Sequence, residues 1–219
     1  MAQGVWQAEV SLRERKKQRT RAMLIDAAIE LCNRQGFEQT TVEQIAAVAD
    51  VSPRTFSRYF ATKDAVMLAS VDEVVEMVAL ELSEQPEDIS DLEALCRAHV
   101  RAFTRTATAP STLLTADRLM ASARIIMSSP SLMHAAPEFR MDAVNAALAK
   151  RMGASWDDQR LKLTAAVWGS ILMTALTRLA PGSDWDTVTV DAIITTVQIT
   201  YAEFVEVATG ARLPALQST

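Results

Sequence analysis

Glycine, cysteine and histidine are scarce in this 219-residue chain, which holds six glycines, two cysteines and two histidines. So few glycines, together with abundant alanine, leucine and methionine, favour an all-helical (all-α) protein. Cys32 and Cys96 stand alone and are expected to be small core residues rather than a disulfide or a site. His99 and His134 are also isolated, and the sequence has no HExxH, paired cysteines, GxSxG or glycine-rich phosphate loop. We therefore expect no metal, no other cofactor and no enzymatic activity.

Long apolar runs are missing as well. The longest uncharged run, Leu163–Thr177, spans 15 residues, whereas a membrane-spanning helix needs about 20. The first residues show no apolar stretch of the signal-peptide type before their charges. The 49% of apolar residues is nevertheless ample for a buried core. These features predict a cytoplasmic protein with no membrane partner.

Charge is distributed unevenly along the chain, whose formal net charge is −5. Residues 1–64 carry ten Lys and Arg against eight Asp and Glu, while residues 65–219 carry twelve against nineteen. Six of the basic residues lie between Arg13 and Arg21, where Glu14 is the one acid. A basic segment on an acidic body indicates a polyanion partner at one end of the molecule. A solvated helix start is the alternative interpretation of the same charges.

Helical periodicity and capping signals predict about nine helices. The first is expected at Arg13–Gln35, with Gly36 as its C-terminal stop. Thr41 with Gln44, or Thr40 with Glu43, forms a capping-box pattern in front of a short second helix that ends near Ala49. A third helix begins at Pro53, and the others are expected at residues 62–82, 90–108, 112–128, 137–152, 157–179 and 187–208.

The segment Val51–Asp64, VSPRTFSRYFATKD, combines a cap, two aromatic residues and several cations. Ser52 can cap the third helix, and Pro53 fits its first position because no N–H is needed there. Phe56 and Phe60 are four residues apart and should both point inward. This leaves a basic, hydrogen-bonding outer face made of Arg54, Thr55, Ser57, Arg58 and Tyr59. Two short helices joined by a three-residue turn, the second exposing such a face, make a helix-turn-helix.

The segment Thr40–Leu68, TTVEQIAAVADVSPRTFSRYFATKDAVML, resembles the DNA-binding segment of TetR-family transcriptional regulators. The resemblance is carried by TTVEQIAAVADVS, by Thr55-Phe56-x-x-Tyr59-Phe60 and by Thr62-Lys63-Asp64. The preceding AAIELCNRQGFEQTT is similar to the first helix and the Gly-Phe turn of that family. The specific match covers Arg19–Leu68, and the remainder of the chain agrees only in length and helix count.

This resemblance implies a helix-turn-helix DNA-binding domain of three helices at residues 13–62, and a helical ligand-binding and dimerisation domain at residues 63–210. Residues 1–12 are then a loosely ordered N-terminus and residues 211–219 a C-terminal tail. The resemblance further implies a homodimer that binds a palindromic double-stranded DNA operator, usually as a repressor, and leaves it when a small-molecule effector binds. An apolar or amphipathic effector is expected from the Met-rich and Leu-rich helices. The alternative is a helical protein-interaction module that has lost its effector response or its DNA role.

The resemblance also assigns residues to the DNA by position. Arg54, near its helix N-terminus, can reach O6 and N7 of a guanine with both fork nitrogens. Many family members carry tyrosine or glycine where this chain has Ser57 and Arg54, so the operator sequence stays open. Contacts to bases or adjacent phosphates are implied for Ser52, Pro53, Arg54, Thr55 and Ser57. Contacts to phosphates are implied for Arg58, Tyr59 and Lys63. Thr41 is implied to lie beside the DNA backbone, where it caps the second helix. For Tyr59, packing alone is the alternative.

Two more sets of residues are expected in the C-terminal part. Apolar seams on the last two helices predict a two-fold four-helix interface, with a more extensive monomeric core as the alternative. Flexible methionines predict a pocket for the effector, although ordinary core filling is the alternative for each. Arg118 and Arg124 could meet an anionic ligand group, but an exposed surface position is expected for both. The interface candidates are Leu161, Ala165, Trp168, Leu172, Val190, Ile194, Val197, Tyr201 and Phe204, and the pocket candidates are Phe103, Met120, Met127, Met141, Val144 and Trp168.

Overall fold

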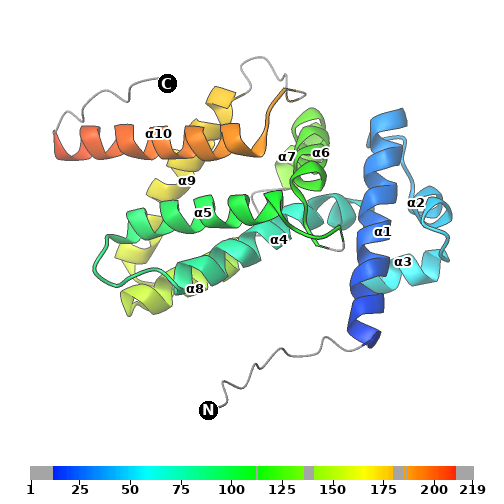
Figure 1. Cartoon of the computed structure of the whole chain (residues 1–219), viewed down its shortest axis with the longest axis horizontal. Helices are drawn as coiled ribbons and strands as arrows, with labels where there is room; N and C mark the ends of the chain where they lie inside the picture. Colours follow the sequence, from blue (N-terminus) through cyan, green and yellow to red (C-terminus); the bar gives the residue numbers. More distant parts are fainter. Residues whose placement is uncertain (1–11, 112, 136–140, 180–184, 186, 211–219) are drawn as a thin grey trace, which may run out of the picture.

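A computed structural model describes residues 12–111, 113–135, 141–179, 185 and 187–210. Within these residues the regular structure is entirely helical, which confirms the all-α class (Figure 1). The expected N-terminal segment before residue 12, the tail at 211–219 and the helix start at Pro137 lie outside the described residues. The ten described helices are α1 (Leu12–Gln35), α2 (Val42–Val48), α3 (Pro53–Tyr59), α4 (Lys63–Ser83), α5 (Asp91–Ala107), α6 (Ala116–Ser128), α7 (Pro130–Ala135), α8 (Asp142–Met152), α9 (Gln159–Leu179) and α10 (Val190–Thr209).

The expected capping residues define the first helices. After α1, Gly36 adopts φ 82°, a left-handed conformation that glycine reaches at little cost. Thr41 and Gln44 form the reciprocal capping box of α2. Asp50 takes φ 52° in the sharp turn between α2 and α3, a conformation that aspartate tolerates better than most residues. These local choices place α2 and α3 at a fixed angle.

Two helices begin later than the sequence predicted, and one helix was not predicted. Helix α6 starts at Ala116 rather than near residue 112, because the Thr115 side chain accepts a hydrogen bond from the amide of Arg118. Helix α10 starts at Val190 rather than at residue 187, since Thr189 caps it in the same way. The short α7 was not expected at all.

Two clusters of buried side chains form the core. The first contains residues of α1, α2 and α3, and it continues into Val66–Ala69 of α4. The second contains Val78 and Leu82 from the other half of α4, together with residues of α5, α6, α8, α9 and α10. Helix α4 therefore links the two clusters as one continuous rod.

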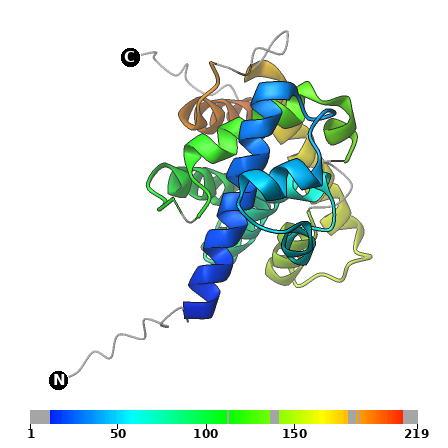
Figure 2. The ribbon, with the colours of Figure 1, turned by 90° about the vertical axis from the view of Figure 1, so that its right-hand side faces the viewer.

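Helices α1, α2 and α3 lie at one end of the molecule, and the other helices extend away from them (Figure 1). Seen from that end, α1 crosses the front of the molecule with α2 and α3 beside it (Figure 2). This arrangement presents α3 and the first turns of α1 together on one outer face. None of the described helices combines the length and the apolar character that crossing a bilayer requires.

Candidate nucleic-acid interface

Helix α3 is short and is anchored by its aromatic residues. Phe56 is 1% exposed and Phe60 is 5% exposed, and their ring centroids lie 5.9 Å apart, which confirms that both point inward. At the N-terminus, the amide of Thr55 donates to Oγ of Ser52 at 3.1 Å, and the two hydroxyls lie 3.0 Å apart. Pro53 occupies the first position of the helix. The buried rings thus fix which face of α3 is turned outward.

The outer face of α3 carries the expected polar side chains. Arg54, Ser57 and Arg58 are exposed, whereas Thr55 and Tyr59 are half-buried. The Ser57 hydroxyl donates to the carbonyl of Pro53 at 3.1 Å, so one of its hydrogen-bonding directions is already used. A shallow hollow of about 420 Å³ lies over this face, lined by Ser52, Arg54, Thr55, Ser57 and Arg58.

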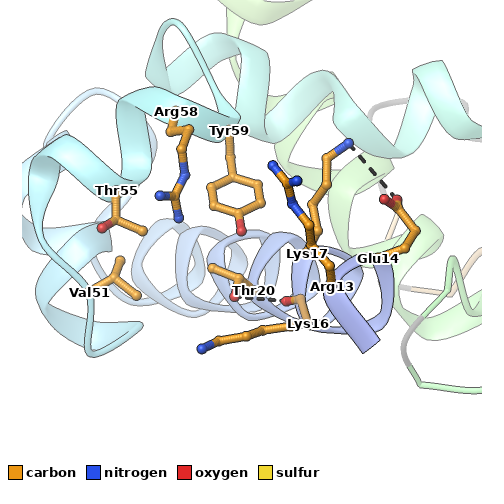
Figure 3. A pocket seen from close by; sticks show the side chains of 9 residues that line it. All are labelled: Arg13, Glu14, Lys16, Lys17, Thr20, Val51, Thr55, Arg58 and Tyr59. Carbon is orange, nitrogen blue, oxygen red and sulfur yellow. Dashed lines mark hydrogen bonds and ion pairs between the residues drawn. The ribbon is translucent and has the colours of Figure 1, made fainter. Parts of the chain in front are cut away.

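A second hollow, of about 770 Å³, lies between α3 and the N-terminal turns of α1 (Figure 3). Arg58 and Tyr59 reach from α3 toward α1, and the Arg58 guanidinium carbon lies 5.3 Å from the Tyr59 ring centroid. Four cations line this basic cleft against one carboxylate, that of Glu14, which pairs with Lys17 at 3.9 Å. A cleft with this charge attracts a polyanion. The lining residues are Arg13, Glu14, Lys16, Lys17, Thr20, Val51, Thr55, Arg58 and Tyr59.

The cations of α1 were not among the residues assigned to DNA from the sequence. Arg13, Lys16 and Lys17 reach the basic cleft because α1 begins at Leu12, so their side chains project from its first turns beside α3. The sequence signal that could have found them was the cluster of six basic residues between Arg13 and Arg21. The resemblance to known helix-turn-helix segments begins only after most of that cluster.

Lys63 has a different environment from the one expected of a phosphate ligand. Its ammonium group donates to the carbonyls of Phe37 at 3.0 Å, Glu38 at 3.3 Å and Thr40 at 3.1 Å. It also lies 4.3 Å from the Phe37 ring centroid. An ammonium group has three hydrogens, and all three have acceptors here. Lys63 therefore fastens the start of α4 to the turn between α1 and α2.

The six residues predicted to line a ligand pocket lie together, but they form part of the packed core of the chain. Met120, Val144 and Trp168 are buried, and Phe103, Met127 and Met141 pack against the same second cluster. His99, which sequence reasoning left aside, is buried in this cluster too: its Nδ1 lies 2.8 Å from the Leu95 carbonyl, and its Nε2 accepts from Nε1 of Trp168 at 3.3 Å. Burial lowers the pKa of His99 to about 4, so the ring is neutral near pH 7.

The expected two-fold seam needs correction. Leu161, Trp168, Val190 and Val197 are each less than 9% exposed within a single chain, so they fill its own core and offer little surface to a partner. The reason is that α5 packs on α10 and covers this side of the α9–α10 pair. The half-buried remainder of the predicted seam is Ala165, Leu172, Ile194, Tyr201 and Phe204.

Another stripe of α9 is turned outward instead. Leu163 is 65% exposed and Met173 is 59% exposed, and the residues between them on the same face are small or apolar and uncharged. Val207 of α10 is 85% exposed. A groove of about 350 Å³ separates the two helices on this side, lined by Val167, Ser170, Ile171, Thr174, Thr200, Glu203, Phe204 and Val207.

Arg118 is not the exposed residue that the sequence suggested. Its side chain is 8% exposed and forms a two-pronged ion pair with Asp26 of α1, with nitrogen–oxygen distances of 2.7 and 2.9 Å. It also donates to the carbonyls of Leu113 and Ser111. These bonds hold α6 against α1, and an ion pair between Arg21 of α1 and Glu73 of α4 joins α1 to α4.

Comparison with known proteins gives a consistent picture of the N-terminal part. Residues 24–70 match the family model described as bacterial regulatory proteins, tetR family. The chain is 45% identical over 87 residues to the HTH-type transcriptional regulator TcmR of Streptomyces glaucescens, covering 40% of this chain and 38% of that protein. It is 34% identical over 79 residues to the HTH-type transcriptional regulator HbdR of Aromatoleum sp. (strain CIB), covering 36% and 34%. The matches thus span little more than a third of either relative.

Solved structures extend the likeness to the whole fold. SmeT, the repressor of the Stenotrophomonas maltophilia multidrug efflux pump SmeDEF, superposes with a TM-score of 0.50. The match covers 84% of this chain and 89% of that chain at 19% sequence identity. At that identity the likeness concerns the arrangement of helices alone.

Proposed function

We propose that this chain is a DNA-binding transcriptional regulator of the tetR family of bacterial regulatory proteins, whose family model matches its residues 24–70, and that it acts as a repressor. The observation that carries the proposal is the outer face of α3 beside the basic cleft, where five cations lie on one side of an otherwise acidic chain. Residues 13–62 form the DNA-binding domain in this proposal, and residues 63–210 the domain for ligand binding and dimerisation.

Base edges are read by α3 and phosphates are held around it. Arg54 is exposed near the N-terminus of α3 and can form two parallel bonds with a guanine, while Ser52, Thr55 and Ser57 line the same hollow. Pro53 is exposed at the start of this helix. Arg58 and Tyr59 hold a phosphate together with the cations Arg13, Lys16 and Lys17 of the basic cleft. Thr41, which caps α2, lies beside the DNA backbone in this proposal. We assign Lys63 to positioning instead of phosphate binding, because its three hydrogens have carbonyl acceptors.

A homodimer places two such surfaces on one operator. We propose the outward stripe of α9, from Leu163 to Met173, and Val207 of α10 as its centre, because an exposed uncharged helical stripe of this kind is typical of an unpaired interface. The half-buried Ile194, Tyr201 and Phe204 support it from behind. Two recognition helices related by a two-fold axis read half-sites about one helical turn apart, about 34–36 Å, which implies a palindromic operator.

Control by a small apolar or amphipathic effector completes the proposal. The second core cluster contains Phe103, Met120, Met127, Met141 and Val144, which are flexible or apolar side chains able to repack around such a ligand. Helix α4 runs from this cluster into the core beneath α3. A ligand that prefers the conformation unable to bind DNA must bind more weakly when operator is present, by the same factor by which it weakens DNA binding.

The decisive experiment is a fluorescence-anisotropy titration of the purified chain with labelled DNA from upstream of its own gene. We expect saturable binding that exceeds binding to scrambled DNA and weakens steeply with salt, because several phosphates are contacted. Equal, weak binding to both DNAs would instead support a helical protein-interaction module without a DNA role.

A further inference from the structure

The turn between α1 and α2, residues 36–41, is hydrogen-bonded to a part of the chain that lies more than ninety residues away. The carboxylate oxygen Oε1 of Glu38 accepts from the hydroxyl of Ser131 at 2.7 Å and from that of Ser129 at 3.4 Å. The two serine oxygens are themselves 2.9 Å apart. Ser129 also accepts from the amide of Leu132 at 3.4 Å, so it caps α7. We name residues 128–132, where α6 ends and α7 begins, the α6–α7 corner.

Apolar packing joins the same two places. Leu132 of α7 is fully buried, and Ile125 and Ile126 at the end of α6 are each 5% exposed. All three belong to the first core cluster, with Phe37 of the turn and Phe56 of α3. The α6–α7 corner therefore contributes Leu132 to the core of the helix-turn-helix. Helix α6, which leads into this corner, contributes Leu119 and Met120 to the second core cluster.

The turn also determines where α2 begins. The Gln35 side chain donates to the carbonyl of Gln39 at 2.9 Å and to Oε1 of Gln44 at 3.0 Å, and Thr41 caps α2. Lys63 at the start of α4 also donates to three carbonyls of the same turn. A displacement of the turn must then displace α2 and, through the fixed α2–α3 angle, the outer face of α3.

We infer that Glu38 is a positioning residue through which the α6–α7 corner sets the orientation of α2 and α3 for DNA. Besides its continuation into α4 and the Asp26–Arg118 ion pair between α1 and α6, the helix-turn-helix is thus attached to the rest of the chain at Glu38. A movement of α6 caused by a ligand in the second cluster reaches α2 directly, without passing along α4. The inference rests on the proposed DNA-binding function.

The test compares Glu38→Ala with Glu30→Ala in the full chain. Glu30 lies on α1, is exposed and pairs only locally with Arg34, so its substitution removes the same charge without touching the α6–α7 corner. Charge removal alone should leave DNA affinity unchanged or raise it. We expect Glu38→Ala to lower the affinity for the upstream DNA about 3- to 10-fold instead, the range that the loss of a coupling contact produces.

Two further variants separate positioning from a general structural effect. Ser131→Ala should lower affinity like Glu38→Ala, the double variant should fall no further, and Ser131→Thr should bind like the wild type because it keeps the hydroxyl. Hydrogen–deuterium exchange of the free protein should rise at residues 42–48 in Glu38→Ala and not in Glu30→Ala. Identical behaviour of the two glutamate variants in both measurements would overturn the inference. If the wild-type chain binds no DNA, the proposed function fails, and the exchange measurement alone then decides whether Glu38 holds the turn.

Discussion

The indole N–H of Trp168 donates a hydrogen bond to His99 in the middle of the second core cluster, with 3.3 Å between Nε1 and Nε2 and 4.9 Å between the ring centroids. Because Nε2 accepts, the proton of the neutral imidazole must sit on Nδ1, which faces the carbonyl of Leu95 at 2.8 Å. Both nitrogens are thus satisfied only in the neutral ring. Protonation would place a second hydrogen against the indole N–H in a buried site.

This arrangement predicts an acid-sensitive fold. Burial lowers the pKa of His99 from 6.5 to about 4, so between these values the unfolded chain binds the extra proton and the folded chain does not. The free energy of unfolding is therefore not reduced by His99 above pH 6.5. As the pH falls from 6.5 to 4, it decreases by about 1.4 kcal/mol per pH unit, on the order of 3 kcal/mol in all. Denaturant unfolding curves recorded from pH 7.5 to pH 4 measure this loss.

His99→Gln provides the matched control. A glutamine amide can donate to the Leu95 carbonyl and accept from the Trp168 indole, but it does not titrate in this range. The variant should therefore lose most of the stability slope between pH 6.5 and pH 4, while any slope from carboxylates remains in both proteins. An unchanged slope would show that the acid sensitivity has another origin.

Arg54 and Arg58 are both exposed on α3, yet we expect their substitution to act differently. Arg54→Ala should cost on the order of 1–3 kcal/mol at particular base pairs and relax discrimination there, because it removes two bonds to a base edge. Arg58→Ala should weaken all sequences alike and lower the salt slope by about one, because it removes a phosphate contact. Binding to a panel of operator variants at several salt concentrations separates the two roles. Equal, sequence-independent losses would contradict the assignment.

The interface proposal predicts a contrast between two helix positions. Met173→Glu places a charge in the outward stripe of α9 and should give a folded monomer, whereas Val197→Glu should unfold the chain because Val197 is 1% exposed in its own core. Met23→Glu, at a 40% exposed position of α1, should remain dimeric. Sedimentation velocity and circular dichroism together report assembly and folding. A dimer that survives Met173→Glu would move the interface to another surface.

Local signals allowed much of the N-terminal structure to be predicted. Gly36, Thr41 and Ser52 act through residues within three or four positions of themselves, and each ended or capped the helix that the sequence assigned to it. The inward position of Phe56 and Phe60 follows from helical spacing alone, and it is confirmed.

Tertiary contacts explain what the sequence could not show. Arg118 looked like a surface cation because its partner Asp26 is 92 residues away. Val197 and Trp168 lie on an apolar face that fits a dimer seam equally well, and only the position of α5 shows that the face is covered within one chain. Periodicity reports that a helix face is buried but not which neighbour buries it. The carbonyl acceptors of Lys63 could not be predicted for the same reason, since they lie more than twenty residues earlier in the chain.

Lys63 also provides the sharpest distinction between holding DNA and holding the fold. If its ammonium group fastens the α1–α2 turn, Lys63→Gln should destabilise folding by about 1–3 kcal/mol and weaken DNA binding with little change in the salt slope. Lys16→Gln, at an exposed cation of the basic cleft, should leave stability unchanged and lower the slope by about one. Thermal unfolding and salt titrations of both variants decide the matter. A reduced salt slope with unchanged stability in Lys63→Gln would return this lysine to the phosphates, and it would require the turn to release it when DNA binds.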